Sequence, residues 1–157
     1  MPAGEEFRHS GDMPIVRVFY PDWEMECCGR PFSVGDEVTW PLVRLDPADP
    51  LRPAPADAAT GELYEFAGHG GGTRFGERVE LAGRVRRIQV VAQGCLAPRP
   101  GEPANERVPD EFWLRPVDTC PKWFKSDVDG VHPPRQGRAY RRMETGALVE
   151  LEADAGG

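Results

Sequence analysis

Glu77–Gln93, with the sequence ERVELAGRVRRIQVVAQ, is the stretch that decides the fold. Its small and apolar residues alternate with polar ones in two opposite phases: first Val79, Leu81, Gly83 and Val85, then Ile88, Val90 and Ala92. A strict period of two cannot change phase, so one extra residue must be accommodated near Arg86 and Arg87. A β-bulge accommodates such a residue and bends the strand. We therefore expect one long bent β-strand, of the kind that lets a small barrel turn a corner.

Shorter segments of similar character lie on both sides of this stretch. They are rich in β-branched and aromatic residues, and they are Ile15–Tyr20, Glu37–Leu42, Leu63–Phe66, Glu111–Arg115, Arg138–Met143 and Ala147–Glu152. Such residues favour strands, although Leu63–Phe66 also fits a helical turn. Asp22–Asp36 is predicted to be a loop. Thr145–Gly146 is predicted to be the turn of a closing hairpin.

These segments predict a mostly β fold with one domain. No segment keeps a helical period over a dozen residues, and turn residues separate five or six short strands. We expect a single small antiparallel β-barrel (SH3-like or OB-like) or a half-open sandwich with long Pro- and Gly-rich loops. The domain is predicted to span residues 14–152, with a flexible N-terminus at 1–13 and a flexible tail at 153–157. Mobile loops are expected at about 46–62, 97–110 and 126–137.

Composition and charge narrow the classes of function. The chain has 157 residues, of which 39% are hydrophobic, and 19 basic against 26 acidic residues give a net charge of −7. This balance argues against a general nucleic-acid or anionic-membrane coat, since either needs a positive field. The apolar runs are far shorter than the roughly 20 residues of a membrane span. The acidic N-terminus does not resemble a secretory signal, so we expect a cytoplasmic protein with reduced cysteines.

Three motifs carry a resemblance to a known group of proteins. They are ECCGRPFSVGDEVTW at 26–40, GRVRRIQVV at 83–91 and PKWF at 121–124. Together they resemble a family of small uncharacterised proteins from GC-rich, actinomycete-type bacteria. The resemblance extends over residues 15–152 and implies one compact domain. The family has no assigned activity, so the resemblance implies no reaction.

The adjacent cysteines Cys27 and Cys28 are the first candidate for chemistry. Neighbouring side chains in an extended segment point apart, so the two thiols bind one tetrahedral metal only if Gly29 supplies a special turn. The paired C-x-x-C spacing of structural zinc sites is absent. We favour ordinary thiols and no cofactor. The alternative is a small zinc-dependent or thiol-based enzyme centred on Cys27, Cys28 and His69, with Arg30 as a further group that favours a thiolate.

Other enzyme motifs give no support for catalysis. The run GHGGG at 68–72 spells the oxyanion-hole motif of some esterases, but the G-x-S-x-G nucleophile motif that must accompany it does not occur. Phosphate-binding glycine loops and the H-E-x-x-H zinc helix do not occur either. The sequence therefore favours a non-enzymatic protein.

Arginines and tryptophans are the remaining candidates for binding. The arginines form two clusters: Arg84, Arg86 and Arg87, then Arg135, Arg138, Arg141 and Arg142. With Trp23, Trp113 and Trp123 they suit a face that stacks bases and contacts phosphates. The acidic net charge instead favours arginines that pair with surface carboxylates, so nucleic acid is not the expected partner.

The favoured interpretation is a binding module for an unknown protein or small ligand. Trp23 and Trp113 are the expected contact residues, with Arg86 and Arg87 beside them, because large aromatic side chains supply most of the contact energy in protein interfaces. Trp40 is assigned to the core. The alternatives that stay open are the metal- or thiol-dependent enzyme and single-stranded nucleic-acid binding through the arginine clusters.

Overall fold

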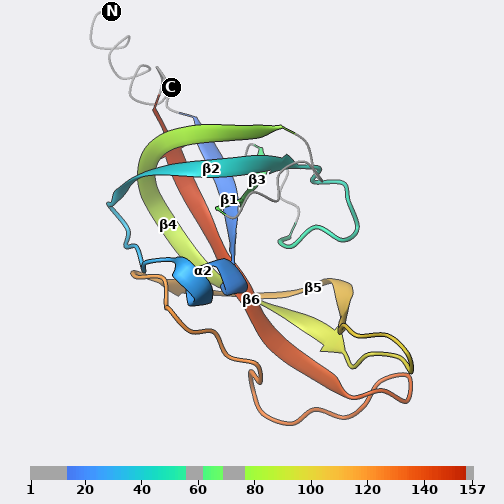
Figure 1. The fold of residues 1–157 in the computed structure, drawn as a ribbon. Coiled ribbons are helices and arrows are strands. Elements are labelled where there is room, and N and C mark those ends of the chain that lie inside the picture. Colours follow the sequence, from blue (N-terminus) through green and yellow to red (C-terminus); the bar gives the residue numbers. More distant parts are fainter. Residues whose placement is uncertain (1–13, 56–61, 69–76, 155–157) are drawn as a thin grey trace, which may run out of the picture.

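The computed structural model describes residues 14–55, 62–68 and 77–154, which form six strands and one short helix (Figure 1). In chain order the elements are β1 (Ile15–Pro21), α2 (Asp22–Cys28), β2 (Glu37–Leu45), β3 (Leu63–Phe66), β4 (Arg78–Leu96), β5 (Glu106–Val117) and β6 (Tyr140–Ala153). The mostly β prediction is confirmed. β5 begins at Glu106, inside the predicted loop 97–110. The predicted flexible N-terminus, residues 1–13, lies outside the described residues.

Five of the strands close into a ring. β1 pairs with β3 and β6, β2 pairs with β3 and β4, and the pairing of β4 with β6 completes the circuit. Within the described residues β5 pairs with β4 alone, and it extends the sheet beyond the ring (Figure 1). β1 and β3 are parallel, so the sheet is mixed and differs from the expected antiparallel arrangement at this pairing. A parallel pairing is possible here because α2 and β2 provide the long connection that it requires.

β4 is the bent strand that the change of phase predicts. Val85 pairs with Leu151 and Arg87 pairs with Glu150, so Arg86 is the extra residue of a β-bulge. On one side of the bulge β4 pairs with β2, and on the other it pairs with β5. Figure 1 shows the resulting curvature, which lets one strand belong both to the ring and to the extension.

The predicted closing hairpin is wrong, because β6 runs through Thr145–Gly146 without a turn. Gly146 pairs with Val91 and Glu144 pairs with Ala92, so Thr145 is an extra residue of a second bulge. A Cβ at position 146 would lie 2.3 Å from the carbonyl oxygen of Tyr20. The glycine therefore permits a close approach of β1 and β6 at the bulge, and it does not reverse the chain.

The predicted loop Asp22–Asp36 is also wrong in its first half, which forms α2. Its seven residues are too few to show a helical period in the sequence. Met25 and Glu24 point inward and are buried. The helix ends where the N–H of Gly29 donates to the carbonyls of Glu24 and Met25, at 3.0 and 3.1 Å. No helix in the described parts of the chain is long and apolar enough to cross a membrane.

The main core fills the ring and is built around four aromatic side chains. Tyr20 stacks on Phe66 with ring centroids 4.1 Å apart, and Trp40 packs edge-on against Tyr20 and Phe32 at 5.5 and 4.9 Å. Trp40 is buried, as expected. Aromatic pairs in these geometries add to the free energy that burial of their area contributes.

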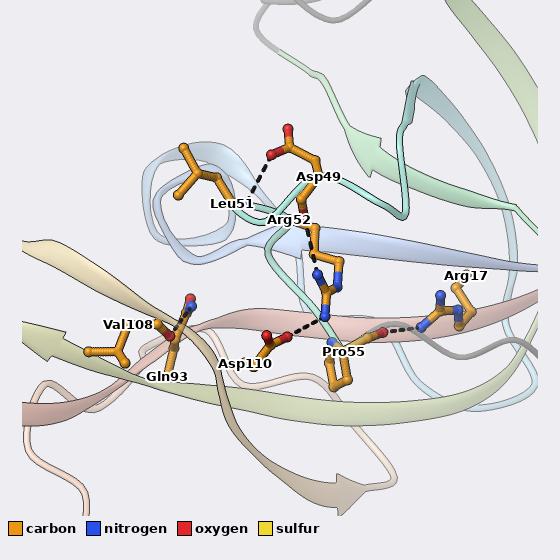
Figure 2. A network of polar contacts seen from close by, with 8 residues as sticks. All are labelled: Arg17, Asp49, Leu51, Arg52, Pro55, Gln93, Val108 and Asp110. Atoms are coloured by element: carbon orange, nitrogen blue, oxygen red, sulfur yellow. Dashed lines mark hydrogen bonds and ion pairs between the residues drawn. The ribbon is translucent and has the colours of Figure 1, made fainter.

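A second core lies on the other face of β1. Val18 and Tyr20 belong to the main core, whereas Phe19 packs with residues of β2, β3, β4 and β6 in a separate cluster. Residues 46–55 contribute Ala54, which is fully buried in this cluster. Figure 2 shows how the segment is held, with Arg52 paired to Asp110 and Arg17 Nη1 donating to the Pro55 carbonyl at 2.8 Å. The described part of the predicted loop 46–62 is thus packed against the sheet.

Candidate binding surface at helix α2

The surface around α2 is formed by two segments that are far apart in the sequence. One segment is α2 itself, and the other is residues 118–125, which follow β5 and lie beside the helix. We call these two segments together the α2 face. Lys122 Nζ donates to the carbonyls of Met25 and Gly29 at 2.7 and 3.0 Å. The Phe124 N–H donates to Glu26 Oε2 at 3.1 Å. These bonds hold residues 118–125 against the last turn of the helix.

The same segment is also tied to the residues that follow α2. The Cys120 N–H donates to the Phe32 carbonyl at 2.8 Å, and the Val34 N–H donates to the Asp118 carbonyl at 2.9 Å. Cys120 is fully buried, and desolvation raises the pKa of its thiol to about 12. Its thiol is therefore neutral at physiological pH and serves the core. Residues 118–125 are thus held both to α2 and to the segment that follows it.

Two tryptophans project from this anchored surface. Trp23, on α2, has 54% of its surface exposed, and Trp123, between Lys122 and Phe124, has 68% exposed. The Lys122 ammonium lies 5.8 Å from the Trp123 ring centroid. Trp23 is one of the predicted contact residues. The sequence suggests Trp123 only as a nucleic-acid contact, because nothing in it indicates that residues 118–125 pack beside α2.

Trp113, the other predicted contact residue, has a different environment. It lies on β5 and pairs with Ala92 of β4, in the extension of the sheet. The guanidinium carbon of Arg142 lies 4.0 Å from its ring centroid, so a cation covers one side of the ring. Trp113 is 36% exposed, which leaves less aromatic area free than at Trp23 or Trp123.

The charge of α2 is acidic. The helix contains Asp22, Glu24 and Glu26 and no lysine or arginine. Glu24 is buried, whereas Asp22 and Glu26 are half-buried. Glu26 lies three residues after Trp23, on the same side of the helix. Partial burial raises the pKa of Asp22, although the Trp23 N–H donates to its carboxylate at 2.8 Å. The helix that carries the exposed indole of Trp23 is therefore acidic.

Cys27 and Cys28 end the helix with both thiols exposed. Their Sγ atoms lie 2.6 Å apart, so the prediction that the side chains point apart is wrong. Neighbouring residues on a helix are about 100° apart around its axis, whereas those on a strand point in opposite directions. The hydrogen bond with Cys27 raises the pKa of Cys28, and the nearby Lys122 ammonium acts in the other direction.

The zinc site stays a prediction, because the structure describes only part of it. His69 lies outside them, so only two of the three predicted ligands have a described position. Among the residues that the structure places, no three His, Cys, Asp or Glu side chains group as metal ligands do. A structural zinc site requires four such ligands.

The arginine clusters pair with carboxylates on the surface. Arg86 Nη1 lies 2.9 Å from Glu152 Oε1, and Arg87 Nη1 lies 3.4 Å from Glu150 Oε2. The other members pair in the same way: Arg84 with Glu37, Arg135 with Glu111, Arg138 with Glu106, Arg141 with Asp127 and Arg142 with Asp129. Each positive charge thus has a negative neighbour, which favours the interpretation as an ion-paired surface.

A pocket of about 410 Å³ lies on another part of the molecule, between residues 44–53, Glu65 and Arg107. Its charged lining is balanced, with arginines at 44, 52 and 107 and acids at 46, 49 and 65. No excess of either sign selects a charged ligand there. The α2 face combines two exposed indoles with an acidic helix, although Lys122 and Lys125 lie in its second segment, and it offers more exposed aromatic area than this pocket.

Comparisons with known proteins identify a family without an assigned activity. A family model described as "Family of unknown function (DUF6578)" matches residues 14–153. The match spans the described elements from β1 to β6. No curated protein matches the chain, and no solved structure matches it.

Proposed function

The chain belongs to this family of unknown function, DUF6578, and we propose that it is a non-enzymatic binding module whose α2 face docks a cationic segment of a partner protein. The observation that supports the proposal most is the exposure of Trp23 and Trp123 on two segments that hydrogen bonds hold together. In this proposal the ring of strands is a small barrel-like scaffold, comparable in role to SH3-like and OB-like modules.

The two indoles suit a protein partner in area and in rigidity. Tryptophan buries a large apolar area on binding and is among the residues most often found at the energetic centre of an interface. Ordering flexible groups opposes association, at about 0.5–1.5 kcal/mol for each immobilised side chain. The Lys122 and Glu26 hydrogen bonds already fix the backbone on which both indoles stand. Docking therefore requires little further ordering of the main chain.

The acidic helix and the net charge of the chain favour a cationic segment, which would meet the Trp23 side of the α2 face and avoid Lys122 and Lys125. Asp22 precedes Trp23 and Glu26 follows it by three residues on the same helix, and the chain as a whole has a net charge of −7. An arginine or lysine of the partner would pack on an indole face and meet a carboxylate at its edge. The negative field of the whole molecule would also speed the encounter with a positive partner.

Selection of peptides from a random library tests this proposal. The wild-type protein is immobilised, and random twelve-residue peptides displayed on phage are selected on it. We expect the selected peptides to be enriched in arginine or lysine together with apolar residues. Synthetic versions should lose about thirtyfold in affinity for Trp23→Ala or Trp123→Ala, which corresponds to about 2 kcal/mol for a central interface residue.

Leu51→Ala is the matched control, because Leu51 is a large apolar residue with 72% exposure that lies outside the α2 face. It should leave the affinity unchanged. Circular dichroism and thermal melting of each variant establish that the fold is intact. Peptides without cationic enrichment, or peptides that bind the Trp23→Ala/Trp123→Ala double variant as tightly as the wild type, would overturn the proposal.

A further inference from the structure

Cys27 and Cys28 form a site that the docking proposal does not use. The two thiols are adjacent in the chain, exposed to solvent and 2.6 Å apart at Sγ, close enough to share a hydrogen bond. The other cysteines, Cys95 and Cys120, are buried. One chain thus contains an accessible pair on its surface and two enclosed thiols that serve as an internal comparison.

We propose that Cys27 and Cys28 are a redox-active dithiol, which a low-molecular-weight disulfide oxidises to a disulfide between the two adjacent residues. The Cys27 thiolate attacks one sulfur of the oxidant, forms a mixed disulfide and releases the first thiolate. Cys28 then loses its proton to solvent, and its sulfur attacks Cys27 Sγ and expels the second thiolate. The protein dithiol loses two electrons, and the oxidant becomes two thiols.

The surroundings support this order of events. The two thiols are in contact, so either sulfur can reach a mixed disulfide formed on the other. We assign Cys28, the thiol that the Lys122 charge acts on, to the step that resolves the mixed disulfide. The Lys122 ammonium, fixed at the end of α2 by its two carbonyl contacts, favours negative charge at Cys28 in the second step.

The product would be easy to reduce, which makes the site reversible. Adjacent Cα atoms are about 3.8 Å apart across a trans peptide, whereas ordinary disulfides join Cα atoms about 4.4–6.8 Å apart. Such a mismatch stores strain and makes the bond more reducible, as in labile or regulatory disulfides. Because the helix ends at Cys28, the adjustment would be confined to the last turn of α2.

Incubation of the native protein with oxidised glutathione at pH 8, without denaturant, tests the proposal. We expect the peptide that contains both cysteines to lose about two mass units, with two equivalents of glutathione released per protein. Dithiothreitol should restore both thiols. Cys95 and Cys120 should stay unmodified, because desolvation raises the pKa of both thiols.

Single variants separate the two chemical steps. Cys27→Ser and Cys28→Ser each leave one exposed thiol, and we expect the Cys28→Ser protein to stop at a mixed disulfide with glutathione. A wild-type protein that also stops at the mixed disulfide, or that keeps two free thiols while the variants react, would overturn the proposal. So would single variants that are both inert. These outcomes do not depend on whether the α2 face docks a partner.

Discussion

Glu111 is a carboxylate in the extension of the sheet that accepts hydrogen bonds from two side chains. Glu111, on β5, accepts a hydrogen bond from Tyr140 Oη at 2.6 Å and another from Arg135 Nη1 at 2.5 Å. Desolvation raises the pKa of Glu111, but these two bonds and the arginine charge outweigh it, so the pKa is lower than its ordinary value. The folded state therefore favours the ionised form.

A pH dependence follows from this shift. The ionised Glu111 stabilises the folded state at pH values above its ordinary pKa of 4.5, and this contribution is lost as the pH falls through the lower pKa of the folded protein. Glu111→Gln should reduce the free energy of unfolding by about 1 kcal/mol at pH 7, and the difference from wild type should shrink as the pH falls below 4.5 and through the lower pKa of the folded protein. Urea unfolding at a series of pH values measures it, with the exposed Glu102→Gln as control. A difference that is constant with pH would contradict this account.

At the scale of elements, Gly146 shows how the absence of a side chain lets two strands pack closely. Its position at a bulge of β6 places it against the Tyr20 carbonyl, and a Cβ would also lie 2.7 Å from the Phe19 ring. Backbone cannot yield as a flexible side chain can, so β1 and β6 would have to separate. Gly146→Ala should reduce the free energy of unfolding by about 3 kcal/mol.

Chemical denaturation of Gly146→Ala and Gly101→Ala measures this cost. Gly101 has a φ of +86°, and a Cβ added there would meet nothing within 4 Å, so its substitution adds backbone strain without a clash. About 1 kcal/mol is expected there. Equal losses in the two variants would show that close strand approach is not what requires Gly146.

The elements also show which features can be predicted from the sequence. The β4 bulge was predictable, because a phase change within one strand is a local pattern, and the pairing of Arg87 with Glu150 confirms its position. The continuous path of β6 could not be predicted, because Thr145–Gly146 has the composition of a turn. Only contact with β1 distinguishes a bulged strand from a turn at this point. Helix α2 is too short for its period to be detected.

Some parts of the candidate site can also be predicted from the sequence, and others cannot. Trp23 was predicted from residue type, and its exposure fits that choice. Trp123 acquires its setting from the bond of Lys122 to the Met25 carbonyl, a contact between segments 97 residues apart in the chain. The proximity of the two cysteine thiols depends on helical geometry that the sequence did not indicate.

At the scale of the whole molecule, the two cores on opposite faces of β1 hold together the ring of strands and residues 46–55, which pack on the second core. Leu151 lies fully buried in the main core, whereas Leu51 lies exposed on the segment that covers the second core. Leu151→Ala should therefore reduce the free energy of unfolding by about 2–5 kcal/mol, and Leu51→Ala by less than about 0.5 kcal/mol. Thermal and urea unfolding of the two variants compare the same chemical change in two environments. Similar losses would contradict the described core.

The closed circuit of strands also limits how this protein can associate with others through its backbone. Every strand of the ring has a neighbouring strand on each side over part of its length, so the ring has no strand that is open along one whole side. Within the described residues, β5 has a neighbouring strand on one side only, so the backbone groups of its other edge face away from the sheet. Pro109 and Pro116 have no backbone N–H to donate, so another strand cannot form a complete set of hydrogen bonds with β5. Extension of the sheet into fibrils or strand-exchanged aggregates is thereby discouraged at this border.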